Sequence, residues 1–226
     1  MENATNNYGR LFLLLLGILF FAMFTGGPPI IRVLVAIGVI LVVLGTLQAT
    51  GVTRRIMRNA TWISVGLALL SVGAGFTEAT SVLAAVSFAA AGGLAASVLL
   101  IVRHIFEMDG ITVREVVGGL TAYTQVALAF SFLYSGTAVL IEEDFFNNGI
   151  AGTSSDFIYF SVVTVTTLGY GDLAPATNVG RSLVVLETLL GQILLIVLVA
   201  FLVGRLGAKR SKVESEHPTS ERRAGK

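Results

Sequence analysis

The sequence of 226 residues contains no cysteine and few charged side chains. The absence of cysteine excludes disulfides, thiol chemistry and thiolate metal sites. Charged residues make up 13% of the chain, hydrophobic residues make up 54%, and the mean hydropathy is +0.84. Because soluble domains carry about 25% charged residues, this composition indicates an integral membrane protein. The Lys and Arg residues lie between apolar segments and in the C-terminal tail, so no basic patch predicts a nucleic-acid partner.

Apolar segments recur along most of the chain. A helix needs about 20 mostly apolar residues to cross the hydrocarbon layer, which is roughly 30 Å thick. Six segments are predicted to cross: Leu11–Phe24, Ile30–Ala49, Thr61–Phe76, Ser81–Phe106, Leu120–Ile141 and Arg181–Leu206. A seventh, Phe157–Thr167, is too short to cross. The first segment also fits the core of a signal peptide, although no Ala-x-Ala cleavage site follows it.

The positions of the basic residues predict a multi-pass protein of the cell membrane with both termini in the cytoplasm. With the N-terminus inside, all of the 15 Lys and Arg residues except Arg32 and Arg181 fall on the cytoplasmic side, as the positive-inside rule requires. An external connection carries Glu142, Glu143 and Asp144. These carboxylates either raise the local cation concentration or form a solvated turn.

The sequence predicts four parts along the chain. Residues 1–106 form four peripheral membrane helices, 107–119 a cytoplasmic interfacial linker, 120–206 a pore domain and 207–226 a flexible cytoplasmic tail. The segment Ser81–Val102 of the fourth span contains no Lys or Arg. Because a voltage sensor needs several such charges within the membrane, steep voltage gating by this helix is not expected.

The chemistry is concentrated between Asp156 and Asp172, in the sequence DFIYFSVVTVTTLGYGD. Ser154, Ser155 and Asp156 are suited to cap the start of a short helix, which is predicted to end at Thr166 or Thr167. Non-helical backbone at membrane depth is tolerated only where it is buried in protein or lines water. A half-length helix followed by a Gly-interrupted return therefore predicts a re-entrant pore loop.

Two glycines alternate with larger residues in the return segment. Gly169 and Gly171 can adopt backbone angles that are closed to other residues. Such angles let successive carbonyl groups point the same way, and stacked carbonyl rings replace the water shell of a cation.

The run from Thr167 to Gly171 resembles the potassium channel superfamily, whose members carry a Thr-x-Gly-Tyr-Gly filter after a short pore helix. The resemblance implies that the carbonyls of Thr167, Leu168, Gly169 and Tyr170, with the Thr167 hydroxyl, coordinate dehydrated potassium ions. It implies that Gly171 completes the filter and that Asp172 braces the outer mouth. It also implies three identical partner subunits, contact with membrane lipid, and no cofactor other than the potassium ions in the filter.

The same resemblance assigns residues outside the filter. Tyr159, Phe160 and Tyr170 match the aromatic cuff around it. The pore helix is expected to be supported by Tyr159, Phe160, Thr166 and Glu187. Residues at helical spacing in the last span are expected to line the cavity and form an apolar gate: Gly191, Gln192, Leu195, Val199 and Val203.

Two residues of the last span have more than one interpretation. Gly191 matches the hinge of the inner helix, and close helix packing is the alternative. Glu187 lies within the membrane, where an ionised side chain costs about 3 kcal/mol or more unless it is paired or faces water. It either stays protonated or hydrogen-bonds to the pore helix or to Gln125. The hypothesis is that Glu187 helps to set the conformation of the filter.

Two rival functions remain beside the potassium channel. A weakly selective cation channel is the first, although Tyr170 argues against the relatives that carry Asp at that position. A transporter or an enzyme is the second. Transport predicts discontinuous helices in corresponding halves, and catalysis predicts clustered acids, bases or metal ligands. Neither pattern is visible in the sequence, so the leading interpretation is a channel without enzymatic activity or catalytic residues.

Overall fold

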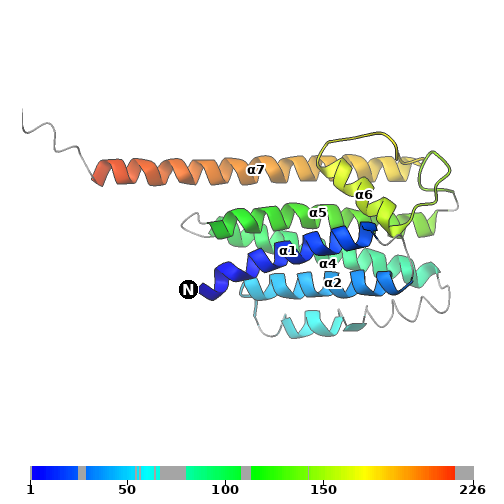
Figure 1. Ribbon diagram of the computed structural model, residues 1–226, viewed down its shortest axis with the longest axis horizontal. Coiled ribbons are helices and arrows are strands. Elements are labelled where there is room, and N and C mark those ends of the chain that lie inside the picture. The colour runs from blue at the N-terminus through cyan, green and yellow to red at the C-terminus, as the bar shows by residue number, and fades with distance from the viewer. Residues whose placement is uncertain are drawn as a thin grey trace, which may run out of the picture.

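The computed structural model describes residues 2–24, 29–53, 55, 57–63, 65–66, 80–107, 113–141 and 143–216. Its labelled elements are all helices: α1 (Glu2–Phe24), α2 (Pro29–Ala49), α4 (Thr80–Glu107), α5 (Val113–Leu140), α6 (Ser154–Val165) and α7 (Asn178–Glu216). Long helices lie side by side in a bundle, and the short α6 lies at one end beside α5 and α7 (Figure 1). The expected all-α architecture is confirmed for the described residues.

Three of these helices are long and apolar enough to cross a membrane. They are α4, the part of α5 from Glu115 to Leu140, and the part of α7 from Asn178 to Gly204. The apolar parts of α1 and α2 within the described residues are shorter. The predicted third span lies mostly outside the described residues, of which 57–63 are helical. The chain is therefore a membrane protein, and its six crossings stay a prediction.

Two helices extend beyond the predicted spans. Helix α5 begins at Val113, so the second half of the predicted linker continues into the fifth span. It packs there through Gly119, where an added Cβ would lie 3.4 Å from Leu198 Cδ1 of α7. Helix α7 continues to Glu216, ten residues past the predicted end at Leu206. Residues 208–216 consist mainly of helix-forming residues, and the first proline comes only at Pro218.

Helices α1 and α2 form an antiparallel pair that packs large side chains against glycine. A Cβ added at Gly38 would lie 2.6 Å from Ile18 Cδ1, and one added at Gly45 would lie 2.4 Å from Leu11 Cδ2. Both pairs of positions are seven residues apart, which is about two helical turns. Ile18 also belongs to a buried cluster that contains Ile158 of α6, and α1 contacts both α5 and α6. The first helix is therefore part of the support of the short helix.

A buried polar chain joins α2, α4 and α5. Ser97 Oγ donates a hydrogen bond to Gln125 Oε1 at 2.6 Å, and Gln125 Nε2 donates to Thr46 Oγ1 at 3.2 Å. All three side chains are essentially inaccessible to solvent. Since an unpaired buried polar group is costly, these bonds favour one register of the three helices.

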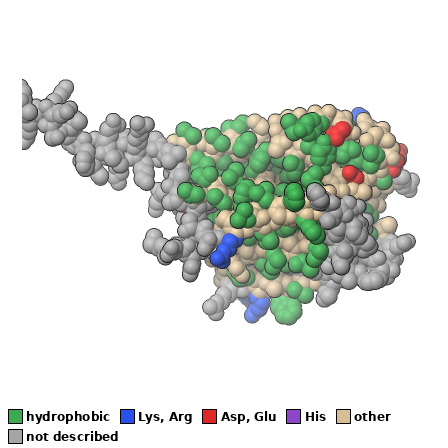
Figure 2. Space-filling view, in the orientation of Figure 1, with side chains coloured by type: hydrophobic (Ala, Val, Ile, Leu, Met, Phe, Trp, Pro, Cys, Tyr) green, Lys and Arg blue, Asp and Glu red, His purple; other side chains and the backbone are tan. Residues whose placement is uncertain are grey.

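Charged side chains are separated along the bundle. Figure 2 shows acidic side chains at the end of the molecule that carries α6, with hydrophobic side chains over much of the remaining described surface. Glu143 and Asp144 are exposed at this end, while Glu142 lies outside the described residues. The ends of α2 and α4 that lead to Arg55 and Arg103 lie at the opposite end (Figure 1).

Candidate functional site: the short helix and its return loop

Helix α6 is short because its two ends are capped twelve residues apart. Thr153 is the N-cap, one residue before the predicted capping residues, and it forms a capping box with Asp156. The Asp156 N–H donates to Thr153 Oγ1 at 3.3 Å, and the Thr153 N–H donates to Asp156 Oδ2 at 2.8 Å. The helix ends at Val165 with Thr166 as C-cap. Its rise of about 18 Å is too small to cross a layer of roughly 30 Å, as predicted.

The backbone after α6 alternates in handedness. Positive φ angles occur at Thr167 (58°), Gly169 (56°) and Gly171 (80°), whereas Leu168 and Tyr170 between them have negative φ. Thr167 is the one non-glycine residue of the described chain with positive φ, a conformation that costs about 1–2 kcal/mol for a residue with a side chain. Alternation of this kind turns successive peptide planes so that their carbonyl groups face one side.

The N–H groups of this segment are bonded to the end of α6. The Thr167 N–H donates to Thr164 O at 2.9 Å, and those of Leu168 and Gly169 donate to Val163 O at 3.0 and 3.4 Å. By contrast, the carbonyl oxygens of residues 167–171 accept no hydrogen bond from the described residues. Because backbone carbonyls are strong acceptors, these exposed oxygens are available to bind water or a cation.

The return loop is exposed in the single chain. Leu168 and Tyr170 keep 57% and 65% of their surface accessible, and Thr167, Gly169, Gly171 and Asp172 are also exposed. An added Cβ at Gly169 or Gly171 would meet no atom within 4 Å. The two glycines are therefore needed for their backbone angles and not to make room for a neighbouring group.

Asp172 ties the end of the loop to the outer surface. The Tyr159 hydroxyl donates to Asp172 Oδ2 at 2.8 Å, and Asn148 Nδ2 donates to the Asp172 carbonyl oxygen at 3.3 Å. The bond to Asp172 raises the pKa of the Tyr159 hydroxyl above its ordinary value, so the phenol keeps its proton and remains the donor. These contacts join Asp172 to α6 and to the loop before it, whereas its role in bracing an outer mouth stays a prediction.

The loop before α6 pairs with the chain after the filter segment. The Asn147 N–H donates to Ala174 O at 2.9 Å, the Ala176 N–H donates to Phe145 O at 2.9 Å, and Phe146 and Pro175 form an antiparallel bridge. This pairing holds the segment that follows Asp172 against the body of the chain.

Phe160 of α6 packs among buried aromatic residues of α5 and of the loop before α6. It is buried, with ring centroids 5.2 Å from Tyr134 and 5.3 Å from Phe146. No contact within the described part of a single chain joins Phe160 to Tyr170. Phe160 therefore supports α6 from behind, whereas the aromatic cuff with Tyr170 stays a prediction.

Glu187 joins three helices behind the loop. It is fully buried, and Ser161 Oγ of α6 donates to its Oε1 while the Tyr134 hydroxyl of α5 donates to its Oε2 at 2.5 Å. Of the partners considered from the sequence, the pore helix is therefore the one found. Gln125 is not a partner, because its side chain bonds to Ser97 and Thr46 instead.

Sequence reasoning missed three of the side chains that position α6. Tyr134 and Ser161 bond to Glu187, and the Tyr123 hydroxyl donates to Val165 O at 2.7 Å at the end of α6. Tyrosine hydroxyls in apolar surroundings usually find a partner, which marks Tyr123 and Tyr134 as polar groups in need of one. Nothing in the sequence indicates which partner each would reach.

Gly191 of α7 lies directly against the last residue of α6. A Cβ at this position would lie 2.5 Å from Val165 Cγ2 and 3.6 Å from the Val165 carbonyl oxygen. Helix α7 is continuous through Gly191 (Figure 1). This contact favours the packing interpretation over the hinge, which stays a prediction.

The expected cavity residues lie off the packed stripe of α7. The buried positions of this helix are Gly180, Glu187, Gly191 and Leu198, whose spacings of seven and four trace one face of a helix. The remaining expected residues are exposed within the single chain: Gln192, Leu195, Val199 and Val203. They are therefore available to line a pore or to meet another subunit.

Known proteins share sequence with the part of the chain that contains α6 and its return loop. Residues 124–207 match the model of a family described as ion channel, and proteins named as potassium channels match parts of this chain. These matches support membership of the matched region, residues 124–207, in the potassium channel superfamily. This region contains most of α5, the whole of α6 with its return loop, and the membrane part of α7.

The individual relatives share only short stretches with this chain, which spans at most 27% of their own lengths. A Rhodopseudomonas palustris protein, named as a candidate potassium channel, is 43% identical over 25% of this chain and 14% of its own length. Potassium channel K1 of Plasmodium berghei is 36% identical over 26% of this chain and 3% of its own length. The inward rectifier potassium channel Kirbac3.1 of Paramagnetospirillum magnetotacticum is 33% identical over 38% of this chain and 27% of its own length. No solved structure matches.

Proposed function

We propose that this chain is one subunit of a potassium-selective channel that conducts passively through a filter built from Thr167–Gly171. The observation that carries the proposal is the row of carbonyl oxygens from residue 167 to 171, which accept no hydrogen bond within the described chain. Potassium channels use such carbonyls to replace the hydration shell of the ion. The Thr167 hydroxyl is proposed to add a ligand at the inner end.

Assembly into a ring of four follows from the exposure of this row. One loop presents oxygens from one side only, whereas a dehydrated cation needs ligands all around it. Leu168 and Tyr170 are largely exposed, and α7 leaves a long apolar surface uncovered that includes Leu189, Ile193 and Ile196. Such a surface is typical of an interface with subunits or lipid. We therefore propose a homotetramer with three identical partners in the cell membrane.

The fields around the proposed pore favour cations. The C-terminal end of α6, at Val165 and Thr166, leads directly into the filter segment, and a helix C-terminus carries a partial negative charge of about half an electron. Val199 and Val203 are proposed to form the apolar gate farther along α7, where closure would occur by dewetting. The Glu187 carboxyl is proposed to hold the filter conformation through Ser161.

Steep voltage gating is not part of the proposal. Helix α4 contains no Lys or Arg before Arg103, near its end. Arg103 Nε donates to Glu107 Oε1 at 2.7 Å in an exposed ion pair. A sensor helix needs several basic residues within the field. With both termini proposed to be cytoplasmic, these two residues lie on the inner side.

The test is the reversal potential of purified full-length protein in planar bilayers with potassium on one side and sodium on the other. A potassium channel shifts the reversal potential toward the potassium equilibrium value. A reversal potential close to zero would support the rival weakly selective channel instead, and absence of any current at all bilayer potentials would overturn both.

A glycine pair provides the matched variants. Gly169→Ala places a side chain at a positive φ without any clash, because no atom lies within 4 Å of the new Cβ. Gly17→Ala also meets no atom within 4 Å but lies at an ordinary helical position. We expect Gly169→Ala to abolish selective conduction and Gly17→Ala to preserve it. Equal currents from both variants would contradict the proposed filter.

A further inference from the structure

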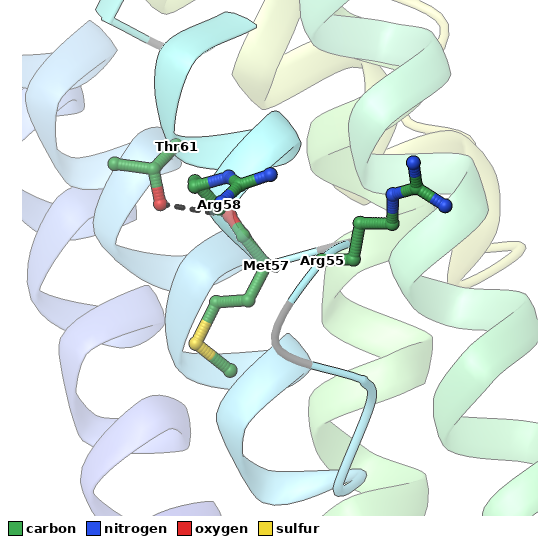
Figure 3. A pocket seen from close by; sticks show the side chains of 4 residues that line it. All are labelled: Arg55, Met57, Arg58 and Thr61. Atoms are coloured by element: carbon green, nitrogen blue, oxygen red, sulfur yellow. Dashed lines mark hydrogen bonds between the residues drawn. The ribbon is translucent and has the colours of Figure 1, made fainter.

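A second feature, far from the filter, consists of two arginines at an open cavity after α2. The cavity has a volume of about 620 Å³ and is lined by Arg55, Met57, Arg58 and Thr61 (Figure 3). Arg55 and Arg58 are exposed, and in Figure 3 their guanidinium groups extend away from the Met57 side chain. The family match begins only at residue 124, so this cavity lies outside the matched region.

The two guanidinium groups have no acidic partner in the described part of the chain. The sequence itself makes such a partner scarce, because it contains no Asp or Glu from residue 3 to residue 77. Two positive charges that share one cavity repel each other. An anion that binds both at once would relieve this repulsion, and Arg is suited to phosphate because its planar fork donates two parallel hydrogen bonds.

The described residues at the arginines, 55 and 57–63, are helical. The Met57 N–H donates to Thr53 O at 3.1 Å, and Thr61 Oγ1 donates to Met57 O at 2.9 Å. On a helix of 3.6 residues per turn, Arg55, Arg58 and Trp62 share one face. Trp62 and the adjacent Ile63 keep 70% and 63% of their surface accessible. The two arginines are therefore followed, about one turn later on the same short helix, by exposed apolar side chains.

We propose that Arg55 and Arg58 bind the phosphate of an anionic phospholipid in the inner leaflet, with Trp62 and Ile63 against its acyl chains. A soluble phosphate would use the arginines but would leave the apolar neighbours without a role. Trp is enriched at membrane interfaces, and basic residues beside a membrane helix attract anionic headgroups. The proposal rests on the proposed cytoplasmic location of this end, opposite α6 (Figure 1).

Native mass spectrometry of the full-length protein tests this site by counting retained lipid. The probes are phosphatidylglycerol and phosphatidylcholine, supplied at equal concentration to wild type and to the double variant Arg55→Gln with Arg58→Gln. We expect wild type to prefer phosphatidylglycerol and the double variant to retain it roughly 25-fold less, which is about fivefold for each arginine. The matched control is Arg103→Gln, which removes an exposed arginine from the same proposed side and should leave retention unchanged.

Two outcomes would overturn the proposal. One is equal retention of phosphatidylglycerol by wild type and the double variant. The other is displacement of the lipid by inorganic phosphate at comparable concentration, together with unchanged retention in Trp62→Ala, which would indicate a site for a soluble anion. Because lipid is counted without any current, this result is independent of the test of conduction.

Discussion

The hydroxyl of Ser161 on α6 donates a hydrogen bond to Oε1 of Glu187 on α7, and both side chains are inaccessible to solvent. Tyr134 of α5 donates to the second carboxyl oxygen. One buried carboxyl group therefore connects α5, α6 and α7 behind the return loop. Removal of one partner from such a network leaves buried polar groups unpaired, which costs more than the bonds contribute on average.

Substitution of Glu187 should separate its hydrogen-bonding role from its charge. Ser161 Oγ also lies 2.5 Å from Ala127 O, and its single hydrogen serves one acceptor at a time. In Glu187→Gln the amide oxygen can accept from Tyr134, and the amide nitrogen can donate to Ser161 Oγ while Ser161 donates to Ala127 O. The substitution should therefore cost about 1 kcal/mol or less. Glu187→Ala removes the acceptor of two buried hydroxyls and should cost about 3 kcal/mol. Thermal unfolding of the purified protein measures both.

Thr188→Ala is the control for these variants. Thr188 Oγ1 bonds only to Val184 O of its own helix, at 2.8 Å, so its loss should change the melting temperature little. If Glu187→Ala melts at the temperature of Thr188→Ala, the buried network does not stabilise the pore domain.

A pair of substitutions should decide between packing and hinge at Gly191. Gly191→Ala brings a methyl group to within 2.5 Å of Val165 Cγ2, and overpacking of this kind typically costs about 1–3 kcal/mol. Val165→Ala removes the atom that the new methyl group meets. We therefore expect the double variant to recover most of the stability and conduction lost in Gly191→Ala. Single-channel recording and thermal unfolding measure the recovery, and a double variant that is stable but does not open would favour the hinge.

Tyr159→Phe should loosen the outer end of the filter segment. The substitution removes the hydroxyl that donates to Asp172 Oδ2 at 2.8 Å and leaves the ring in place. Asp172 loses this donor, so its carboxylate is held less firmly and the fraction of time spent conducting should fall. Single-channel recording in symmetric potassium measures this fraction. Ser182→Ala, which removes an exposed hydroxyl bonded to Asn178 O, should behave as wild type, and an unchanged Tyr159→Phe would contradict the bracing role.

Gln125→Leu should weaken the attachment of the peripheral helices to α5. The variant removes the bonds to Ser97 Oγ and Thr46 Oγ1, although Ser97 keeps its bond to Leu94 O at 2.8 Å. The loss leaves Thr46 with fewer partners in a buried site, and we expect a cost of about 1–2 kcal/mol. Hydrogen exchange should rise in α2 and α4 before α6. Thr124→Ala, which affects only a bond to Leu120 O, is the neighbouring control.

Some features of the site could be predicted because they depend on neighbours in sequence. The length of α6 follows from a capping residue and from the Thr and Gly residues after Val165. The positive φ angles of Gly169 and Gly171 follow from the absence of a side chain. The capping residue itself was displaced by one, because Ser, Thr and Asp at adjacent positions are all suitable.

The helix ends and the backbone angle of Thr167 could not be predicted, because hydropathy averages over a span and contains no information on either. The predicted start of the fifth span at Leu120 and the predicted end of the sixth at Leu206 were wrong as helix bounds, because helix continues past the apolar stretch wherever residues such as those at 208–216 favour it. Threonine does not favour a positive φ, so the residue type at position 167 gives no sign of the observed angle. It is imposed by the bonds that Thr167, Leu168 and Gly169 make to the last turn of α6.

By itself, the sequence determined that this is a membrane protein with a half-length helix and a glycine-containing return, because apolar length and backbone freedom are local properties. Only the tertiary structure decided that Glu187 pairs with Ser161 and Tyr134 while Gln125 pairs with Ser97 and Thr46. Those partners are 26 to 79 residues apart in the chain. Which of several buried polar groups meet depends on how the helices rotate against one another, and that rotation is set by packing across the whole bundle.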